Sequence, residues 1–398
     1  MKTLRKIFPH ILVLALVLGM TYVEPARLEA ADYYYKGEKL TFSSGTLKKY
    51  KGKVCYAISE ETASQLPGVT AEYAGQGPCI EVRNQNHYMV IFGGDQVAYV
   101  DGGKKKLSIL PKNVPNGDKS YMLVPLEDLL SGLKIKYKWN SRKTVCTLKK
   151  RKYDVSGKTT YTTYPYTFNS YAKKEAKRNT LYKLKDYKKA LKISEDTTEG
   201  FKYLCLDTYR KVKKKKFIGF YNNRIEIYCR INKMEPTESS LYGKENAKAL
   251  LAAAKKYKID PVYFASQTFL ESAYGTTVLA KGKKVGKKKK KKKVYNLYGI
   301  KAYDRNPEKY GFAYAKKKGW TTIPKALAGA AEYVAKNYIH SKYKQNTLFK
   351  YRYIPSTQLW HQYASDPFYA EKIGQKFQIM SCVYQKNVKF RYDYPKWK

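Results

Sequence analysis

The sequence predicts a chain of two folded domains, a small α+β domain followed by a mainly α domain. Its length of 398 residues exceeds what one ordinary hydrophobic core covers. Residues 33–150 show the alternating apolar pattern of β-strands, whereas the residues from Lys244 onward show the period of helices. The hydrophobic fraction of 43% is near the globular average, so we expect both domains to bury a core.

The first 30 residues have the pattern of a signal peptide. Basic residues near the start precede an unbroken apolar run over residues 11–20, and Ala26, Ala30 and Ala31 offer a cleavage site. This run is too short to span a bilayer, which needs about 20 residues. We therefore interpret residues 1–30 as a signal peptide, with an uncleaved anchor as the alternative. No later segment could cross a membrane, so we expect the mature protein outside the cell.

The charge balance predicts a polyanionic partner. Lys and Arg total 79 against 32 Asp and Glu, which gives a formal charge of +47. Nucleic acid is one class of partner, but an exported protein meets teichoic acids and other anionic wall polymers first. Residues 283–293 (KKVGKKKKKKK) add a solvated lysine-rich loop, for which a tolerated insertion is an equal alternative. Alternatively, the excess of positive charge serves only to keep the protein soluble.

The cysteine and histidine content argues against a metal site. The six cysteines include no C-x-x-C pair, and the chain has only four histidines. In an exported chain an even number of cysteines permits disulfides. Cys55 and Cys79 are the candidates for a pair because they are close in sequence, and buried free thiols are equally plausible.

Strand and turn signals dominate the α+β domain at residues 33–150. In residues 134–139 (KIKYKW), Ile135, Tyr137 and Trp139 alternate onto one face, and residues 144–148 form the return strand. Before this hairpin, residues 116–133 predict a turn, a short strand and a short helix that Pro125 opens and Gly132 closes.

This stretch resembles the copper amine oxidase N-terminal-like domain of secreted bacterial proteins. The matching pieces are Asn116-Gly117, Val124-Pro125-Leu126 and Trp139-Asn140. The resemblance implies an accessory domain that binds no copper, so it assigns no catalytic residue.

Residues 151–200 are rich in Tyr, Thr and Lys and poor in aliphatic residues, so we interpret them as a linker that could hold a short helix. Residues 216–231 follow as a predicted hairpin across Asn222 and Asn223, because Ile225, Ile227 and Cys229 alternate.

Glu271 is the candidate catalytic acid. Asp260 and Pro261 are the N-cap and first residue of a predicted apolar helix that ends near Ser272. Glu271 lies in its last turn, where partial burial and the negative end of the helix dipole both raise the pKa of a carboxyl group. A carboxylic acid that keeps its proton near neutral pH can protonate a glycosidic oxygen. An exposed glutamate without a role is the alternative.

The surrounding motifs resemble the bacterial glucosaminidases of glycoside hydrolase family 73, of the autolysin and mannosyl-glycoprotein endo-beta-N-acetylglucosaminidase type. Five ordered segments carry the resemblance: residues 270–280 (LESAYGTTVLA), 295–304 (YNLYGIKAYD), 310–322, 345–355 and 361–366 (HQYASD). The chain departs from the family in the lysine-rich insertion and in Tyr353, where the autolysins usually have Trp.

The resemblance implies that residues 201–398 are a lysozyme-like catalytic domain with a small β lobe and without a metal or organic cofactor. It assigns the general acid to Glu271. Asp304 is the candidate for the second catalytic group, followed by Glu308. Alternatively, the N-acetyl oxygen of the substrate attacks the anomeric carbon.

Aromatic residues near these motifs are candidates for the glycan groove, because sugar C–H faces stack on aromatic rings. We expect Tyr274, Tyr295, Tyr298 and Tyr333 to bind substrate and Asn296 to support the groove floor, although each tyrosine could be core. His361 has no triad partner in the sequence and is interpreted as structural.

Together these patterns predict a secreted, wall-associated endo-β-N-acetylglucosaminidase that cleaves the β-1,4 bond after N-acetylglucosamine in peptidoglycan strands. A lytic transglycosylase on the same fold and a wall-binding protein with an inactive domain are the alternatives. A nucleic-acid binder would rest on charge alone, so no nucleic-acid partner is expected.

Overall fold

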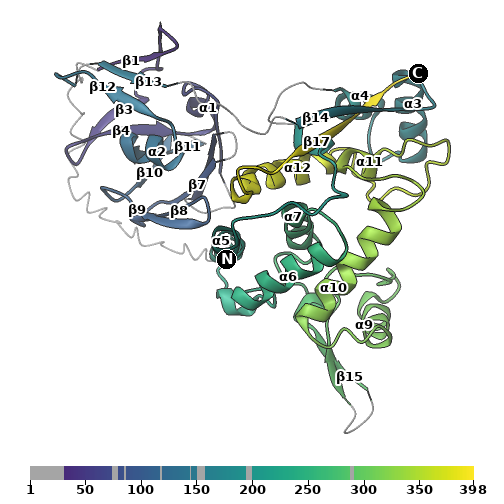
Figure 1. Ribbon diagram of the computed structural model, residues 1–398. Helices are drawn as coiled ribbons and strands as arrows, with labels where there is room; N and C mark the ends of the chain where they lie inside the picture. The colour runs from purple at the N-terminus through teal and green to yellow at the C-terminus, as the bar shows by residue number, and fades with distance from the viewer. Residues whose placement is uncertain are drawn as a thin grey trace, which may run out of the picture.

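The computed structural model describes residues 31–73, 79–84, 87–116, 119–143, 145–149, 157–193, 200–286 and 291–398. A sheet-rich N-terminal region lies beside a helical C-terminal region, as Figure 1 shows. This arrangement confirms the prediction of a multidomain chain. The predicted signal peptide lies outside the described residues. Within the described ranges, no helix has both the length and the apolar character to cross a bilayer.

In its described residues, the N-terminal region contains three sheets and two short helices, α1 (Glu60–Ala63) and α2 (Leu126–Gly132). In the order of their pairing, the first sheet contains β12 (Tyr137–Trp139), β13 (Val145–Leu148), β1 (Asp32–Tyr35) and β2 (Glu38–Lys39). The second contains β10 (Lys112–Asn116), β11 (Lys119–Pro125), β4 (Lys53–Ile58) and β3 (Leu47–Tyr50). The third contains β5 (Val69–Tyr73), β6 (Cys79–Asn84), β7 (His87–Phe92), β8 (Val97–Val100) and β9 (Gly103–Lys106).

Local patterns predicted part of this region correctly. β12 and β13 pair in the expected antiparallel hairpin, with Trp139 opposite Cys146. α2 begins directly after Pro125 and ends at Gly132, and its leucines are buried because they recur at helical spacing. The pairing of Cys55 with Cys79 was wrong, because these residues lie on different sheets and in separate apolar clusters. All six cysteines are buried free thiols.

The described part of the C-terminal region is mainly helical and contains two small two-stranded sheets. Its longer elements are β14 (Gly157–Thr163), α3 (Phe168–Arg178), α4 (Leu184–Leu191), α5 (Lys214–Ile231), α6 (Lys244–Lys256), α7 (Pro261–Glu271), α9 (Pro307–Lys317), α10 (Ile323–Val334), α12 (Tyr369–Met380) and β17 (Phe390–Lys396). Short elements complete it: α8 (Val278–Lys281), the hairpin β15 (Lys283–Val285) and β16 (Lys292–Val294), the π-helical turn Ala335–Ile339 and α11 (Leu348–Arg352). The lysine-rich hairpin projects away from the helices (Figure 1).

The segment predicted as a linker is instead part of this folded region. β14 pairs in parallel with β17 along its whole length, and Figure 1 shows the two strands side by side. α3 and α4 follow, and the tyrosines Tyr164, Tyr171 and Tyr187 are fully buried in a shared cluster with Phe349. The lack of aliphatic residues was misleading, because tyrosine rings supply the apolar surface that buries this segment.

The hairpin predicted across Asn222 and Asn223 is also wrong, because residues 214–231 form the long helix α5. α5 is buried on more than one side, which imitates the alternation of a strand. Phe220 contacts Tyr88 of the N-terminal region at a ring distance of 4.8 Å, and Tyr221 contacts Phe269 of α7 at 5.1 Å. α5 therefore joins the two regions.

Charged pairs and a close backbone approach fix this interface. Glu81 of β6 accepts from Arg224 of α5 at 2.6 Å, and Arg230 pairs with Asp95 at 2.6 Å. Gly219 of α5 lies against the turn at Gly102, where a Cβ on Gly219 would come within 2.2 Å of the Gly102 carbonyl oxygen. Only glycine allows this approach.

We expect Gly219→Ala to lower the free energy of unfolding by about 1–3 kcal/mol, because the methyl group must push the two regions apart. Denaturant unfolding measures the change, and Gly103→Ala is the matched control. A Cβ on Gly103 would make only an ordinary contact, 3.6 Å from the Val100 oxygen. Equal destabilisation by the two variants would contradict this description of the interface.

Candidate active site

Helix α7 is a rigid support for its last residue, Glu271. The Asp260 side chain caps the helix by accepting from the amides of Val262 and Tyr263 at 2.9 and 3.0 Å. It also accepts from Arg210 at 2.8 Å and from the Tyr384 hydroxyl at 2.6 Å, so this buried cap is satisfied on all sides. Residues 261–269 are buried, and exposure begins only at the C-terminal end of the helix.

The Glu271 carboxyl group is half-buried and asymmetrically bound. Its Oε1 accepts from Gln267 Nε2 at 2.6 Å and from the Tyr363 hydroxyl at 2.8 Å. No described residue donates a hydrogen bond to Oε2, and no described Lys or Arg pairs with this carboxylate. Burial raises the pKa of Glu271, and the bonds from Tyr363 and Gln267 oppose that rise only in part. Oε2 is therefore the oxygen that can carry a proton and donate it.

Neutral phenol groups surround this carboxyl group. Tyr369 donates to Gln267 Oε1 at 2.7 Å, which orients the Gln267 amide towards Glu271. Tyr298 hydrogen-bonds Thr268 of α7 at 3.0 Å. Burial, with the charge on Glu271 as a smaller cause, raises the pKa of Tyr298, Tyr363 and Tyr369 well above the usual value. The phenols keep their protons, so they add no charge near Glu271.

The loop that carries Tyr363 is held by buried side chains. Gln345 donates to the His361 carbonyl at 2.9 Å, and its own oxygen lies 2.8 Å from His361 Nδ1. The Tyr363 amide donates to the Tyr351 carbonyl at 2.9 Å. Gln362 donates to Glu175 of α3 at 2.6 Å. Both contacts of His361 with Gln345 hold the loop in place, which agrees with a structural role for this histidine.

The candidates for a second catalytic group lie apart from these contacts. Asp304 is exposed in the turn before α9, and within the described ranges its carboxylate makes no hydrogen bond or ion pair. Glu308 lies in the first turn of α9 and pairs with Lys283 at 3.6 Å. The structure gives neither residue a contact with Glu271.

Tyr274 does not take the position predicted for it. Its backbone is in the left-handed region at φ +57°, which turns the ring back under α7. The ring is sandwiched between Tyr228 at 4.5 Å and Phe269 at 4.8 Å, so both faces are covered. Burial alone would raise its pKa, but the charges of Arg224 and Lys376 lower it. Tyr274 is a core residue, because neither face can receive a sugar.

The other predicted groove residues divide into supports and accessible rings. Asn296 is buried and donates to the carbonyls of Ile300 and Gly311 at 2.9 and 3.1 Å, which ties the segment before α9 to that helix. Tyr298 is buried against Phe264 of α7. Tyr295 and Tyr333 are half-buried, so part of each ring is accessible.

Sequence reasoning missed Gln267, Tyr363 and Tyr369. Gln267 stands four residues before Glu271, so the two side chains share a helix face, and this spacing could have identified it. Tyr363 lies in the HQYASD segment, but this motif alone assigns no role to the tyrosine. No signal pointed to Tyr369, because its contact with Gln267 spans 102 positions.

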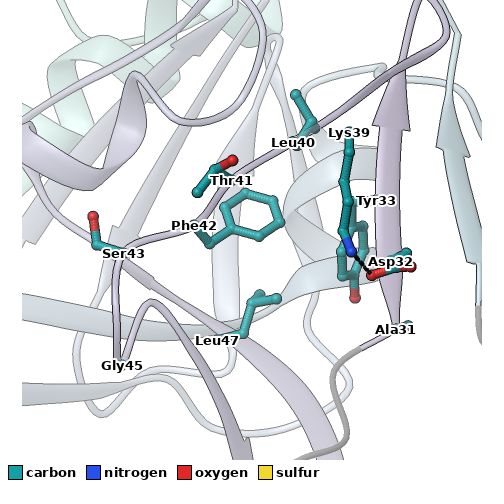
Figure 2. A pocket seen from close by; sticks show the side chains of 10 residues that line it. All are labelled: Ala31, Asp32, Tyr33, Lys39, Leu40, Thr41, Phe42, Ser43, Gly45 and Leu47. Carbon is teal, nitrogen blue, oxygen red and sulfur yellow. Dashed lines mark ion pairs between the residues drawn. The ribbon is translucent and has the colours of Figure 1, made fainter.

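Two hollows of the N-terminal region are separate from this site. The larger, about 820 Å³, is lined by residues of α1 and of β10 and β11. The smaller, about 320 Å³, is lined by Tyr33, Phe42 and Leu47, with the Lys39–Asp32 ion pair at its edge (Figure 2). Neither is lined by a residue of α7. In the described part of the chain, no cluster of His, Cys, Asp and Glu could hold a metal ion.

Comparison with known proteins assigns the part of the chain that contains Glu271. Residues 247–381 match the family model described as Glucosaminidase, mannosyl-glycoprotein endo-beta-N-acetylglucosaminidase. The predicted glucosaminidase domain is therefore confirmed for these residues. The copper amine oxidase N-terminal-like domain stays a prediction.

Two relatives are 40% identical to this part of the chain. One is a Beta-N-acetylglucosaminidase of Bacillus subtilis (strain 168), matched over 139 residues that make up 34% of this chain and 15% of the relative. The other is a Bifunctional autolysin of Staphylococcus aureus (strain N315), matched over 152 residues that make up 37% of this chain and 12% of the relative. The chain thus spans a small part of the length of these relatives.

A solved structure, the crystal structure of S. aureus glucosaminidase B, is 27% identical and covers 61% of this chain and 95% of its own. Its TM-score of 0.45 is too low to establish a common fold.

Proposed function

We propose that this protein is a secreted peptidoglycan hydrolase, an endo-β-N-acetylglucosaminidase that cleaves the β-1,4 bond after N-acetylglucosamine, with Glu271 as the general acid. One observation carries the proposal: a half-buried carboxyl group with a raised pKa ends a rigid helix, within the residues that match the glucosaminidase family. The two relatives, whose names are Beta-N-acetylglucosaminidase and Bifunctional autolysin, support the same reaction class.

In the proposed reaction, protonated Glu271 donates its proton from Oε2 to the glycosidic oxygen. Oε1 is already occupied by the bonds from Gln267 and Tyr363, which fix the plane of the carboxyl group. The bond between the anomeric carbon and this oxygen breaks as positive charge develops on the sugar ring. Water then adds to the anomeric carbon, and its proton restores the acid.

Asp304 is the proposed second group, which would activate the water or stabilise the positive charge. Its exposed carboxylate has no described partner that would hold it elsewhere. Attack by the N-acetyl oxygen of the substrate is the alternative. The half-buried rings of Tyr295 and Tyr333 are proposed to contact the glycan, with the buried Asn296 and Tyr298 as supports.

The lysine-rich surface is proposed to hold the enzyme on anionic wall polymers. The net charge is +47, and the described lysines of the hairpin β15–β16 are exposed beside α9. Screening by salt weakens attraction between exposed charges. Secretion and wall association rest on the export pattern of residues 1–30 and on the charge.

Analysis of the cleavage products tests the proposed function. Peptidoglycan digested with the full chain should yield fragments with reducing N-acetylglucosamine ends, detected by mass spectrometry after borohydride reduction. Anhydro-sugar ends would instead show a lytic transglycosylase, and no cleavage would show an inactive domain. Asp304→Asn belongs in the same assay, because full activity of this variant would favour attack by the substrate.

Tyr363→Phe is expected to move the alkaline limb of the kcat/KM profile to higher pH. The Tyr363 hydroxyl donates to Glu271 and lowers its pKa, so removal of that bond raises the pKa further. A general acid works only while protonated, and activity is lost as pH rises through its pKa. Tyr161→Phe, at an exposed tyrosine on β14, is the control. An unchanged limb or a limb at lower pH would refute this role of Tyr363.

A further inference from the structure

We propose that Trp360 is a binding platform for a sugar ring of the glycan strand, in a subsite continuous with Glu271. The proposal rests on the proposed function and extends its substrate site. Trp360 is 64% exposed, although tryptophan side chains are mostly covered in folded proteins. Trp360 lies three residues before Tyr363, which hydrogen-bonds Glu271, so a large open ring at this position needs a functional explanation.

The Trp360 ring is held in position by its neighbours. Its centroid lies 5.2 Å from the His361 ring and 5.8 Å from the Tyr343 ring, and its plane is nearly perpendicular to both. His361 and Tyr343 themselves stack at 4.2 Å. The two stacked rings support Trp360 along one side and leave more than half of its surface open. A ring ordered before binding loses little conformational freedom when a ligand stacks on it.

The backbone on both sides of Trp360 is also fixed. Arg178 of α3 donates to the Leu359 carbonyl, and Gln345 donates to the His361 carbonyl at 2.9 Å. Farther along the loop, Asn179 donates to the Ser365 carbonyl at 3.2 Å. The platform is therefore part of a rigid loop.

Ring contacts connect this platform to the general acid. The His361 ring lies 5.1 Å from Tyr338, and Tyr338 lies 4.9 Å from Tyr363. Tyr363 donates directly to Glu271. An unbroken line of aromatic contacts thus runs from Glu271 to Trp360. A glycan strand bound for cleavage at Glu271 could place a more distant sugar on Trp360.

The chemistry around Trp360 fits a sugar that carries acidic substituents. Sugar C–H faces stack on aromatic rings, and indole offers the largest face of the natural side chains. Lys342 and Lys344 are exposed on either side of Tyr343 in the sequence, and Lys342 Nζ lies 5.4 Å from the Tyr343 ring. These cations suit the carboxylates that muramic acid and its stem peptides carry. The expected occupant is therefore a glycan strand with its acidic peptides.

The test compares Trp360→Ala with Tyr161→Ala. Tyr161 is 67% exposed and lies on β14, so it is a matched exposed aromatic residue outside this loop. With soluble peptidoglycan fragments as substrate, Trp360→Ala should raise KM about three- to tenfold and leave kcat nearly unchanged, because the stacking contact is made in the ground state and the transition state alike. Tyr161→Ala should change neither constant, and Trp360→Tyr should restore part of the affinity.

A binding measurement separates this proposal from the proposed function. The same fragments are titrated into Glu271→Gln and into Glu271→Gln/Trp360→Ala by calorimetry, where no cleavage occurs. Weaker binding of the double variant supports the platform even if the wild-type chain proves unable to cleave glycans. Equal binding by both, together with an unchanged KM, overturns the platform and leaves the hydrolase proposal intact. Trp360→Ala with a lowered kcat and an unchanged KM would also contradict a binding role.

Discussion

Replacement of Glu271 by Gln is expected to lower kcat for glycan cleavage by on the order of 10²- to 10⁴-fold, the range typical of a lost general acid. The amide has the shape of the carboxyl group and can still accept from Tyr363, but it cannot give up a proton to the glycosidic oxygen. Zymograms and product release measure the loss. Glu245→Gln, at an exposed glutamate of α6, is the control and should retain full activity.

The same variant should become more stable than the wild type as the pH rises. Burial raises the pKa of Glu271 in the folded protein above its unfolded value, so the folded state binds the proton more tightly. This contribution to stability is present at acidic pH and is lost as pH rises through the folded pKa. Glu271→Gln cannot ionise, so its thermal midpoint should equal that of the wild type at acidic pH and exceed it at alkaline pH. A variant that is less stable at every pH would indicate a structural role for Glu271.

Glu175→Ala is expected to lower the free energy of unfolding by about 3–5 kcal/mol, because it leaves a buried guanidinium without its counter-charge. Glu175 of α3 pairs with Arg352 at 2.7 Å, and both side chains are only 1% exposed. Denaturant unfolding measures the effect. The double variant Glu175→Leu/Arg352→Met should recover most of the loss, because it removes both buried charges.

An exposed ion pair gives the matched control. Glu332 and Lys336 pair on the surface of α10 and the turn that follows it, so Glu332→Ala should cost less than about 1 kcal/mol. If Glu175→Ala and Glu332→Ala lowered the free energy of unfolding equally, α3 would not be an integral part of the helical region. Glu175 also accepts a hydrogen bond from Gln362, which precedes Tyr363 in the loop. Glu175→Ala should therefore also lower the activity under conditions in which the variant is still folded.

Local signals predicted the elements that local interactions determine. The hairpin β12–β13, the helix α2 after Pro125 and the capped helix α7 all follow from patterns within about ten residues. The folded state of residues 157–193 could not be predicted in this way. β14 pairs with β17 more than 200 positions away, and the tyrosines that bury α3 and α4 read as polar in a sequence pattern.

The candidate site shows the same division. The sequence pattern correctly predicted that Glu271 lies in the last turn of α7, because the Asp260 cap, Pro261 and a run of apolar residues define the helix. Tyr274 follows three residues later, and its left-handed backbone reverses the ring into the core, which a residue pattern does not reveal. Tyr363 reaches Glu271 from 92 positions away, so only the folded chain shows the contact.

The most direct test of Glu271 as the general acid is a titration of its carboxyl group. NMR of side-chain carboxyls in a glutamate-labelled chain, assigned by the signal missing from Glu271→Gln, should show Glu271 titrating above the usual range for glutamate. The alkaline limb of the kcat/KM profile should fall at the same pH. Two results would contradict the assignment of the general acid. One is a Glu271 carboxyl group that titrates in the usual range, and the other is an alkaline limb of the kcat/KM profile at a pH different from the Glu271 pKa.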